Sequence, residues 1–242
     1  MLKTKFVSSQ IKAFLDDKID SFAPLKTISV LGGERLSFCL LYVDEGEPYL
    51  PSRPYGEMKL EGQLAQYTTV RDVRMVPVDR PVVPGYVDDQ YLRTKPGLYP
   101  DLLTPLRYGG KVIISRDMLR SLWLEVEIPE NFSGTSTLSI TVTDPETKTA
   151  ATESVEIAVI AANLPEQKLM FTQWLYADCL ASYYNVPAWS EKHWRIVENF
   201  VRSAVRMGVN VILTPIFTPA LDTQVGGERT TVQLVDVAVE KG

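Results

Sequence analysis

A strand-helix-strand pattern near the end of the sequence limits most strongly what this chain can fold into. Residues 169–174 and 209–214 are two short apolar runs, and the spacing of apolar side chains between them predicts an amphipathic helix over residues 190–207. Ser190 can cap the start of this helix, and Gly208 follows its end. Two such strands joined by a helix form a right-handed parallel unit, found in doubly wound sheets and in eight-stranded barrels.

Several side chains should gather where these two parallel strands end, because the carboxyl edge of such a sheet is the usual place for a ligand. Aromatic faces suit the apolar face of a sugar ring, and charged groups suit its hydroxyls. The run Gly-Gly-Glu-Arg at 226–229 is either a mobile tip or a substrate clamp. The candidate substrate-binding residues are Trp174, Tyr176, Asp178, Thr214, Asp222, Glu228 and Arg229.

The aromatic residues among these candidates have a second interpretation. Together with Tyr183, Tyr184 and Trp189, the rings of Trp174 and Tyr176 form a cluster in the sequence that could simply fill the space between two domains. A sugar platform and a packing cluster therefore both stay open. The only histidine, His193, falls in the first turn of the predicted helix, where a solvated side chain is favoured over a role in ligand binding.

Alternating apolar and polar residues over about 25–162 predict a different kind of domain. Short strands of this pattern, separated by turns, are typical of an antiparallel β-sandwich. Residues 36–42 are expected to form a strand with one buried face, and the Asp-Pro-Glu-Thr run at 144–147 is expected to form a hairpin turn. The proline-rich connection 78–110 either reaches toward the next domain or covers the sandwich core.

The two patterns meet near residue 165, so we predict two domains. Residues 1–165 form an antiparallel β-sandwich, and residues 166–242 form the first strand-helix-strand unit of an eight-stranded β/α barrel, which gives a mixed β and α/β fold class. Only 242 − 168 = 74 residues follow Lys168, whereas a complete barrel needs about 250. The barrel should therefore be incomplete, and its uncovered sheet edge predicts self-association.

Composition restricts the partners of this chain. The net charge is −5 with scattered basic residues, which argues against nucleic acid. We expect a cytoplasmic protein with no membrane partner, because no apolar stretch has the length of a signal sequence or a membrane span. Cys39 and Cys179 are expected to be buried thiols. The sequence contains no P-loop, G-x-G-x-x-G, C-x-x-C or H-E-x-x-H motif, so no cofactor or metal is expected.

Several stretches resemble bacterial proteins related to glycoside hydrolase family 123, from about residue 30 to the end. In the second domain the similar stretches are 176–181, 193–200, 212–219 and 226–229, and in the first they are 96–103 and 121–126. The resemblance implies a β-sandwich followed by a catalytic barrel that acts on N-acetylgalactosaminides. In such enzymes the substrate's own acetamido oxygen attacks the anomeric carbon, one acid orients it, and a neighbouring glutamic acid protonates the leaving oxygen.

The Asp-Glu pair that this mechanism implies belongs to a later barrel strand of the family. In this sequence the only Asp-Glu dipeptide is Asp44-Glu45, in the predicted sandwich. We therefore expect no catalytic residue in this chain. Two hypotheses remain: the chain is the amino-terminal portion of a glycosidase and is inactive by itself, or it is a carbohydrate-binding or protein-interaction module in which the sandwich does the work.

Overall fold

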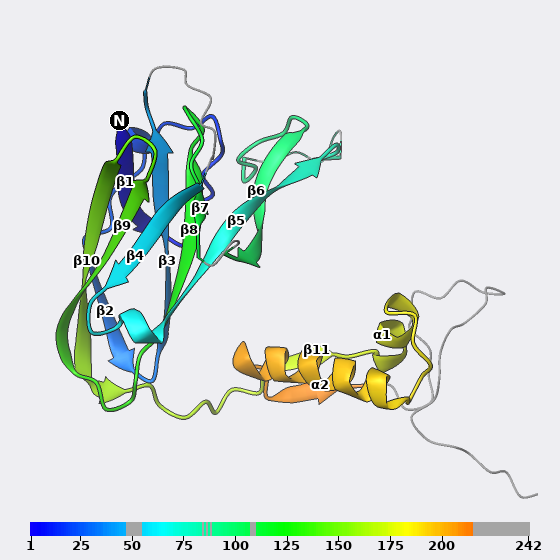
Figure 1. The fold of residues 1–242 in the computed structure, drawn as a ribbon. Coiled ribbons are helices and arrows are strands. Elements are labelled where there is room, and N and C mark those ends of the chain that lie inside the picture. Colours follow the sequence, from blue (N-terminus) through cyan, green and yellow to red (C-terminus); the bar gives the residue numbers. More distant parts are fainter. Residues whose placement is uncertain (47–54, 84, 86, 88, 107–109, 215–242) are drawn as a thin grey trace, which may run out of the picture. The chain divides into compact units, whose positions relative to one another are not determined.

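The computed structural model describes residues 1–46, 55–83, 85, 87, 89–106 and 110–214, and the chain divides into two compact units (Figure 1). The first unit is Met1–Leu164, and the second begins at Pro165. Each unit is described by itself below.

The first unit consists of two five-stranded sheets that enclose one apolar core. Strand order in the first sheet is β1-β3-β8-β5-β6, and in the second it is β2-β10-β9-β4-β7. Both sheets contribute fully buried side chains to this core, such as Phe38 from β3 and Ile140 from β9, so the sheets fit the predicted sandwich. The strands are β1 (Leu2–Ser8), β2 (Thr27–Gly32), β3 (Arg35–Asp44), β4 (Tyr55–Glu61), β5 (Thr68–Val78), β6 (Gly97–Pro105), β7 (Val112–Ile113), β8 (Arg120–Glu127), β9 (Gly134–Asp144) and β10 (Thr149–Asn163), with short 3-10 helices at Ile19–Ser21 and Ala65–Tyr67.

Strand β9 shows why alternation in the sequence was informative. Leu138, Ile140 and Val142 point into the core and are fully buried. The residues between them carry hydroxyls, and two of these bond across to β10: Ser139 lies 2.8 Å from Ser154, and the hydroxyls of Thr141 and Thr152 are also 2.8 Å apart. The turn after β9 is the predicted hairpin, because the Asp144 carboxylate accepts from the backbone N–H groups of the next residues.

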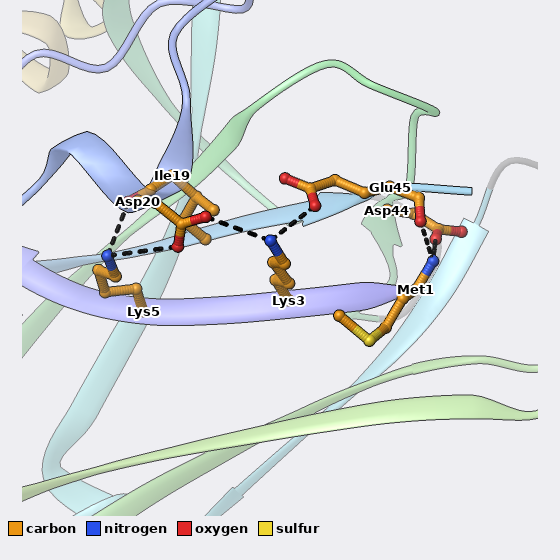
Figure 2. Close-up of polar contacts among 7 residues, drawn as sticks. All are labelled: Met1, Lys3, Lys5, Ile19, Asp20, Asp44 and Glu45. Carbon is orange, nitrogen blue, oxygen red and sulfur yellow. Dashed lines mark hydrogen bonds and ion pairs between the residues drawn. The ribbon is translucent and has the colours of Figure 1, made fainter.

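Strand β3 is buried on both faces, which corrects the expectation of one buried face. Strand β1 pairs with β3 in antiparallel register, from Leu2 opposite Asp44 to Ser8 opposite Phe38. The segment after β1 then covers the outer face of β3, where Cys39 and Leu41 pack in a second cluster with Ala13. Lys5 supports this cover by donating to the carbonyl of Ile19 at 2.8 Å (Figure 2). The first 27 residues are therefore part of the folded unit.

Two further features differ from the predicted antiparallel sandwich. Strand β2 pairs with β10 in parallel, with Ile28 opposite Ile157. Part of the connection predicted over 78–110 is the regular strand β6, which pairs with β5. The described remainder of that connection is tied to the amino-terminal segment, because Arg93 lies 2.7 Å from Asp16 and its guanidinium stacks 3.7 Å from the Phe14 ring centroid. The Arg93 hydrogen bond also lowers the pKa of the Asp16 carboxyl.

The two thiols differ in exposure, and only Cys39 fits the expectation of buried thiols. Burial raises the pKa of Cys39 to about 12, whereas Cys179 is exposed. At pH 8 about one Cys39 side chain in ten thousand is then a thiolate, the form that reacts. We expect Ellman's reagent to label one thiol per native chain within minutes at pH 8, and the second only after denaturation. Equal rates for both thiols in the native protein would contradict the packing of the outer cluster.

The second unit contains a pair of parallel strands and two helices in its described part. Strand β11 (Thr172–Trp174) pairs with β12 (Val211–Leu213), with Trp174 opposite Leu213. Helix α1 spans Ala177–Tyr183, and helix α2 spans Glu191–Arg206, as the periodicity predicted. Ser190 accepts from the His193 N–H at 3.3 Å, and Gly208 has a φ of 88°, so both predicted helix boundaries are correct.

The described residues do not extend to a barrel. Two parallel strands are present between 165 and 214, and the predicted apolar face of α2 is only partly covered, since Trp194, Phe200 and Val205 remain exposed. Leu213, expected in a buried strand, is exposed as well. An incomplete barrel and self-association through it therefore stay predictions. No helix among the described residues is long and apolar enough to cross a membrane.

Candidate functional site

The described candidate residues lie at the carboxyl ends of β11 and β12. Trp174 is the last residue of β11, and Thr214 directly follows β12. Tyr176 is half-buried at the cap of α1, and Asp178 is buried in its first turn. Because β11 and β12 run in parallel, the residues that follow them share one edge of the sheet. Asp222, Glu228 and Arg229 lie outside the described residues.

Trp174 and Tyr176 form a stacked aromatic pair at this edge. Their ring centroids are 6.1 Å apart and their planes differ by 11°. Trp174 is 61% exposed, which is unusual for so large an apolar side chain. Residues 174 and 176 point to the same side because side chains alternate along an extended backbone. The local structure thus presents two nearly parallel rings, at least one of them open to solvent.

The remaining aromatic residues of the predicted cluster make other ring contacts. Tyr183 packs edge-on against Tyr184 at 5.1 Å, and Tyr184 packs against Phe200 of α2 at 6.3 Å. Trp189 packs on Trp194 with centroids 5.4 Å apart. Tyr183 and Tyr184 are exposed as well. The Trp174–Tyr176 pair differs from these rings because it directly follows β11 at the carboxyl edge of the parallel strands, and it is therefore the candidate platform.

His193 is fully buried, which corrects the expectation of a solvated histidine. Its Nδ1 lies 2.9 Å from the backbone nitrogen of Trp189, and its Nε2 lies 2.7 Å from the carbonyl oxygen of Ala177. The sequence pattern favours a solvated side chain here over a role in ligand binding. The available indications were its place three residues after the capping Ser190, where a side chain leans back over the cap, and its aromatic neighbour Trp194.

The Asp44-Glu45 dipeptide lies in the first unit, where both carboxylates pair with cationic groups (Figure 2). Asp44 is 2% exposed, ion-paired with Arg116, and its Oδ1 lies 2.9 Å from the amino group of Met1. Glu45 lies 2.6 Å from Lys3, whose pKa is raised first by this hydrogen bond and then by one to Asp20. The two acids have cationic partners and belong to the unit that does not carry the candidate platform.

One apolar groove of about 120 Å³ lies on the outer face of the first sheet, apart from the predicted residues. Its floor includes Leu41, Val73 and Trp123, and Lys12 and Asp101 pair across its rim at 3.2 Å. Among the described residues, no group of three or more His, Cys, Asp or Glu side chains could hold a metal ion.

Comparisons with known proteins relate this chain to one family of glycosidases. Residues 174–242 match the model of the catalytic domain of glycoside hydrolase family 123. Among solved structures, a family 123 glycoside hydrolase from Clostridium perfringens, described for glycolipid glycan hydrolysis, has a TM-score of 0.66 and 17% sequence identity over 88% of this chain and 38% of its own. At this identity the likeness shows the fold, and the chain spans 38% of the length of that enzyme.

Two other structures are less similar. The C-terminal domain of the BspA polypeptide of Streptococcus agalactiae has a TM-score of 0.31 and 13% identity over 65% of this chain and 49% of its own. The PapD-like domain 7 of human CEP192 has a TM-score of 0.28 and 9% identity over 59% of this chain and 84% of its own. No curated protein matches the chain. The family match and the shared fold confirm the predicted resemblance, and this chain is similar to glycoside hydrolase family 123 proteins.

Proposed function

We propose that this chain supplies part of the glycan-binding face of a family 123-type glycoside hydrolase. One observation carries the proposal: the exposed Trp174 ring and its half-buried neighbour Tyr176 follow β11 at the carboxyl edge of the parallel strands, within the stretch that matches the family's catalytic domain. A pyranose ring has an apolar face of C–H groups that packs on an aromatic ring. The exposed face of Trp174 is therefore the proposed platform.

Polar groups beside this platform would bind the hydroxyls. The Asp178 carboxylate lies two residues beyond Tyr176, and the Thr214 hydroxyl lies after the neighbouring strand. A carboxylate accepts hydrogen bonds and a hydroxyl both donates and accepts, so together they suit the vicinal hydroxyls of a sugar. We assign Asp222, Glu228 and Arg229 to the same face on the sequence alone.

The proposed substrate is an N-acetylgalactosamine-containing glycan, and the proposed mechanism is substrate-assisted. The acetamido oxygen attacks the anomeric carbon while a carboxylic acid protonates the leaving oxygen. Asp44 and Glu45 do not suit this task, because both are engaged in ion pairs of the first unit. In this proposal the chain binds the sugar, and the catalytic acid comes from residues that this chain does not contain.

The alternative is a module in which the sandwich binds the ligand. Its support is the apolar groove on the first sheet, a concave site whose rim carries charged groups. The two functions differ in what they require of Trp174, which belongs to the second unit and not to the sandwich.

Replacing Trp174 with alanine should therefore separate them. We expect Trp174→Ala to weaken binding of methyl N-acetyl-β-galactosaminide about tenfold, the equivalent of ~1.4 kcal/mol, in isothermal titration calorimetry. Because the ring is 61% exposed, we expect the free energy of unfolding to fall by less than about 1 kcal/mol, whereas truncating a buried tryptophan costs about 3–5 kcal/mol.

The matched control is Tyr67→Ala, which removes an exposed aromatic ring from the first unit. This variant should bind the sugar as the unmodified chain does. If Trp174→Ala keeps full affinity while the sugar still binds, the platform is wrong and the sandwich becomes the better candidate. A collapse of the second unit in Trp174→Ala would show that the ring is a packing residue.

A further inference from the structure

The His193 ring makes a hydrogen bond through each nitrogen, although sugar binding as proposed above requires no histidine. Nδ1 faces the backbone N–H of Trp189 at 2.9 Å, and Nε2 faces the carbonyl of Ala177 at 2.7 Å. A backbone N–H only donates and a carbonyl only accepts, so Nδ1 is the acceptor and Nε2 carries the proton. Its neighbours thus require the neutral imidazole in the Nε2–H tautomer.

The bond to Ala177 reaches the candidate site directly. Ala177 is the first residue of α1 and stands between Tyr176 and Asp178, two of the proposed sugar-binding residues. His193 lies in the first turn of α2, 16 residues away in the sequence. The hydrogen bond therefore fixes the start of α2 against the point where the chain leaves β11 and enters α1. This point determines where the Tyr176 ring lies beside Trp174.

The bond to Trp189 holds a strained backbone. Trp189 has a φ of 62°, in the left-handed region that bulky residues rarely adopt. Its N–H donates to the imidazole, and its ring packs on the same imidazole with centroids 5.1 Å apart. A strained backbone of this kind persists only where surrounding contacts hold it in place, and it is most common at functional sites such as ligand-binding sites. His193 supplies both restraints at once.

We propose that His193 is a positioning residue of the aromatic sugar site. It does not touch the sugar. Through Ala177 it places Tyr176 and Asp178, and through Trp189 it fixes the loop that leads into α2. The effect on sugar binding rests on the proposed function, whereas the tautomer and the loop restraint are properties of the chain without ligand. The two ideas can therefore fail separately.

The first test needs no variant. His193 is the only histidine in the sequence, so a long-range ¹H–¹⁵N correlation spectrum of the uniformly labelled chain contains one imidazole. We expect the pattern of the neutral Nε2–H tautomer at pH 7.5. An Nδ1–H tautomer or an imidazolium would overturn the proposal, because neither can accept from Trp189 and donate to Ala177.

The second test compares two substitutions that differ in hydrogen bonding. His193→Gln keeps an acceptor and a donor at the end of the side chain, whereas His193→Phe keeps a flat ring but loses both bonds. We expect His193→Phe to weaken binding of methyl N-acetyl-β-galactosaminide about tenfold, and His193→Gln by less than about threefold, since each net hydrogen bond is worth a few-fold in affinity. Lys192→Gln, an exposed change in the same turn, is the control and should bind normally.

Limited proteolysis with chymotrypsin gives a ligand-free measurement of the same restraint. Cleavage after Tyr184 or Trp189 should be at least about fivefold faster in His193→Phe than in the unmodified chain and in His193→Gln, because opening of the loop controls access. Equal cleavage rates in His193→Phe and the unmodified chain would overturn the proposal.

If the unmodified chain binds no sugar, the proposed function fails, and the tautomer and the cleavage rates still decide the role of His193. If His193→Phe does not fold, the tautomer decides it.

Discussion

The purified 242-residue chain is expected to release nitrophenol from 4-nitrophenyl N-acetyl-β-galactosaminide at least about a hundredfold more slowly than a version extended through a complete family 123 barrel. Hydrolysis needs an acid held against the leaving oxygen and a second group that positions the acetamide. A misplacement of about 1 Å can already cost a hundredfold in rate. A discontinuous assay of both proteins at equal concentration provides the measurement.

The carboxylates of the second unit explain this expectation. Glu191 and Glu198 lie on the surface of α2, where they pair with Arg195 at 3.4 Å and Arg202 at 2.7 Å. Asp178 is a buried carboxylate at the candidate face. Its neighbours in the sequence are Ala177 and Cys179, so it is not part of an Asp-Glu pair. The other candidates, Asp222, Glu228, Asp236 and Glu240, lie outside the described residues. Turnover by the short chain that disappears in Asp178→Asn would show that catalysis was assigned to the wrong part of the family's barrel.

Replacing Asp44 with alanine is expected to lower the free energy of unfolding by about 3 kcal/mol, because the change removes a buried carboxylate that pairs with both Arg116 and the Met1 amino group. Asp44 is 2% exposed, and its partner Arg116 is only 18% exposed. The Met1 amino group also loses its ion pair with this carboxylate, although it keeps its hydrogen bond to the Glu45 carbonyl (Figure 2). Urea unfolding followed by circular dichroism near 217 nm measures the change.

The neighbouring residue provides the control for this prediction. Glu45→Ala removes a partner of Lys3 at a more exposed position, where solvent screens the charges and the pair adds little to stability. A free energy of unfolding that falls no further in Asp44→Ala than in Glu45→Ala would mean that the buried ion pair adds little to stability. The pairing of β1 with β3 would then be enough to hold the amino terminus in place.

The sequence predicted elements well where one face of an element is buried and the other is solvated. Leu138, Ile140 and Val142 alternate with hydroxyl residues because β9 lies between the core and water. Helix α2 was equally clear, because Ser190 and Gly208 mark its ends and apolar residues recur at helical spacing. In both cases the local pattern and the final environment agree.

Prediction was poorer where burial comes from distant segments. The outer face of β3 is covered by residues that precede it in the chain, and Cys39 and Leu41 gave no indication of which segment would cover them. Residues 1–27 have mixed composition, so only the pairing of β1 with β3 reveals their place. The parallel contact of β2 with β10 likewise depends on topology and not on local pattern.

For the candidate site, the sequence identified which residues follow the strands but not how they interact. Trp174, Tyr176 and Thr214 lie at the carboxyl ends of β11 and β12, as parallel pairing requires. The separation of the Trp174–Tyr176 pair from the other rings is a matter of three-dimensional packing. The prediction of a solvated His193 is wrong because a side chain in the first turn of a helix is usually exposed. The contacts that bury this side chain come from the preceding loop and from α1, which the local sequence pattern does not show.

The parallel pairing of β2 with β10 also affects how the chain folds during synthesis. Strand β2 occupies residues 27–32 at one edge of the second sheet, and its neighbour β10 occupies residues 149–163. At roughly 5–20 residues per second of translation, β2 waits on the order of ten seconds for its partner to leave the ribosome. Closing so distant a contact is slow as well, because the loop entropy is lost before the contact stabilises the sheet. The last strand of the sandwich thus completes the sheet that one of its first strands begins, and nascent chains arrested before residue 149 should expose β2 to chaperones.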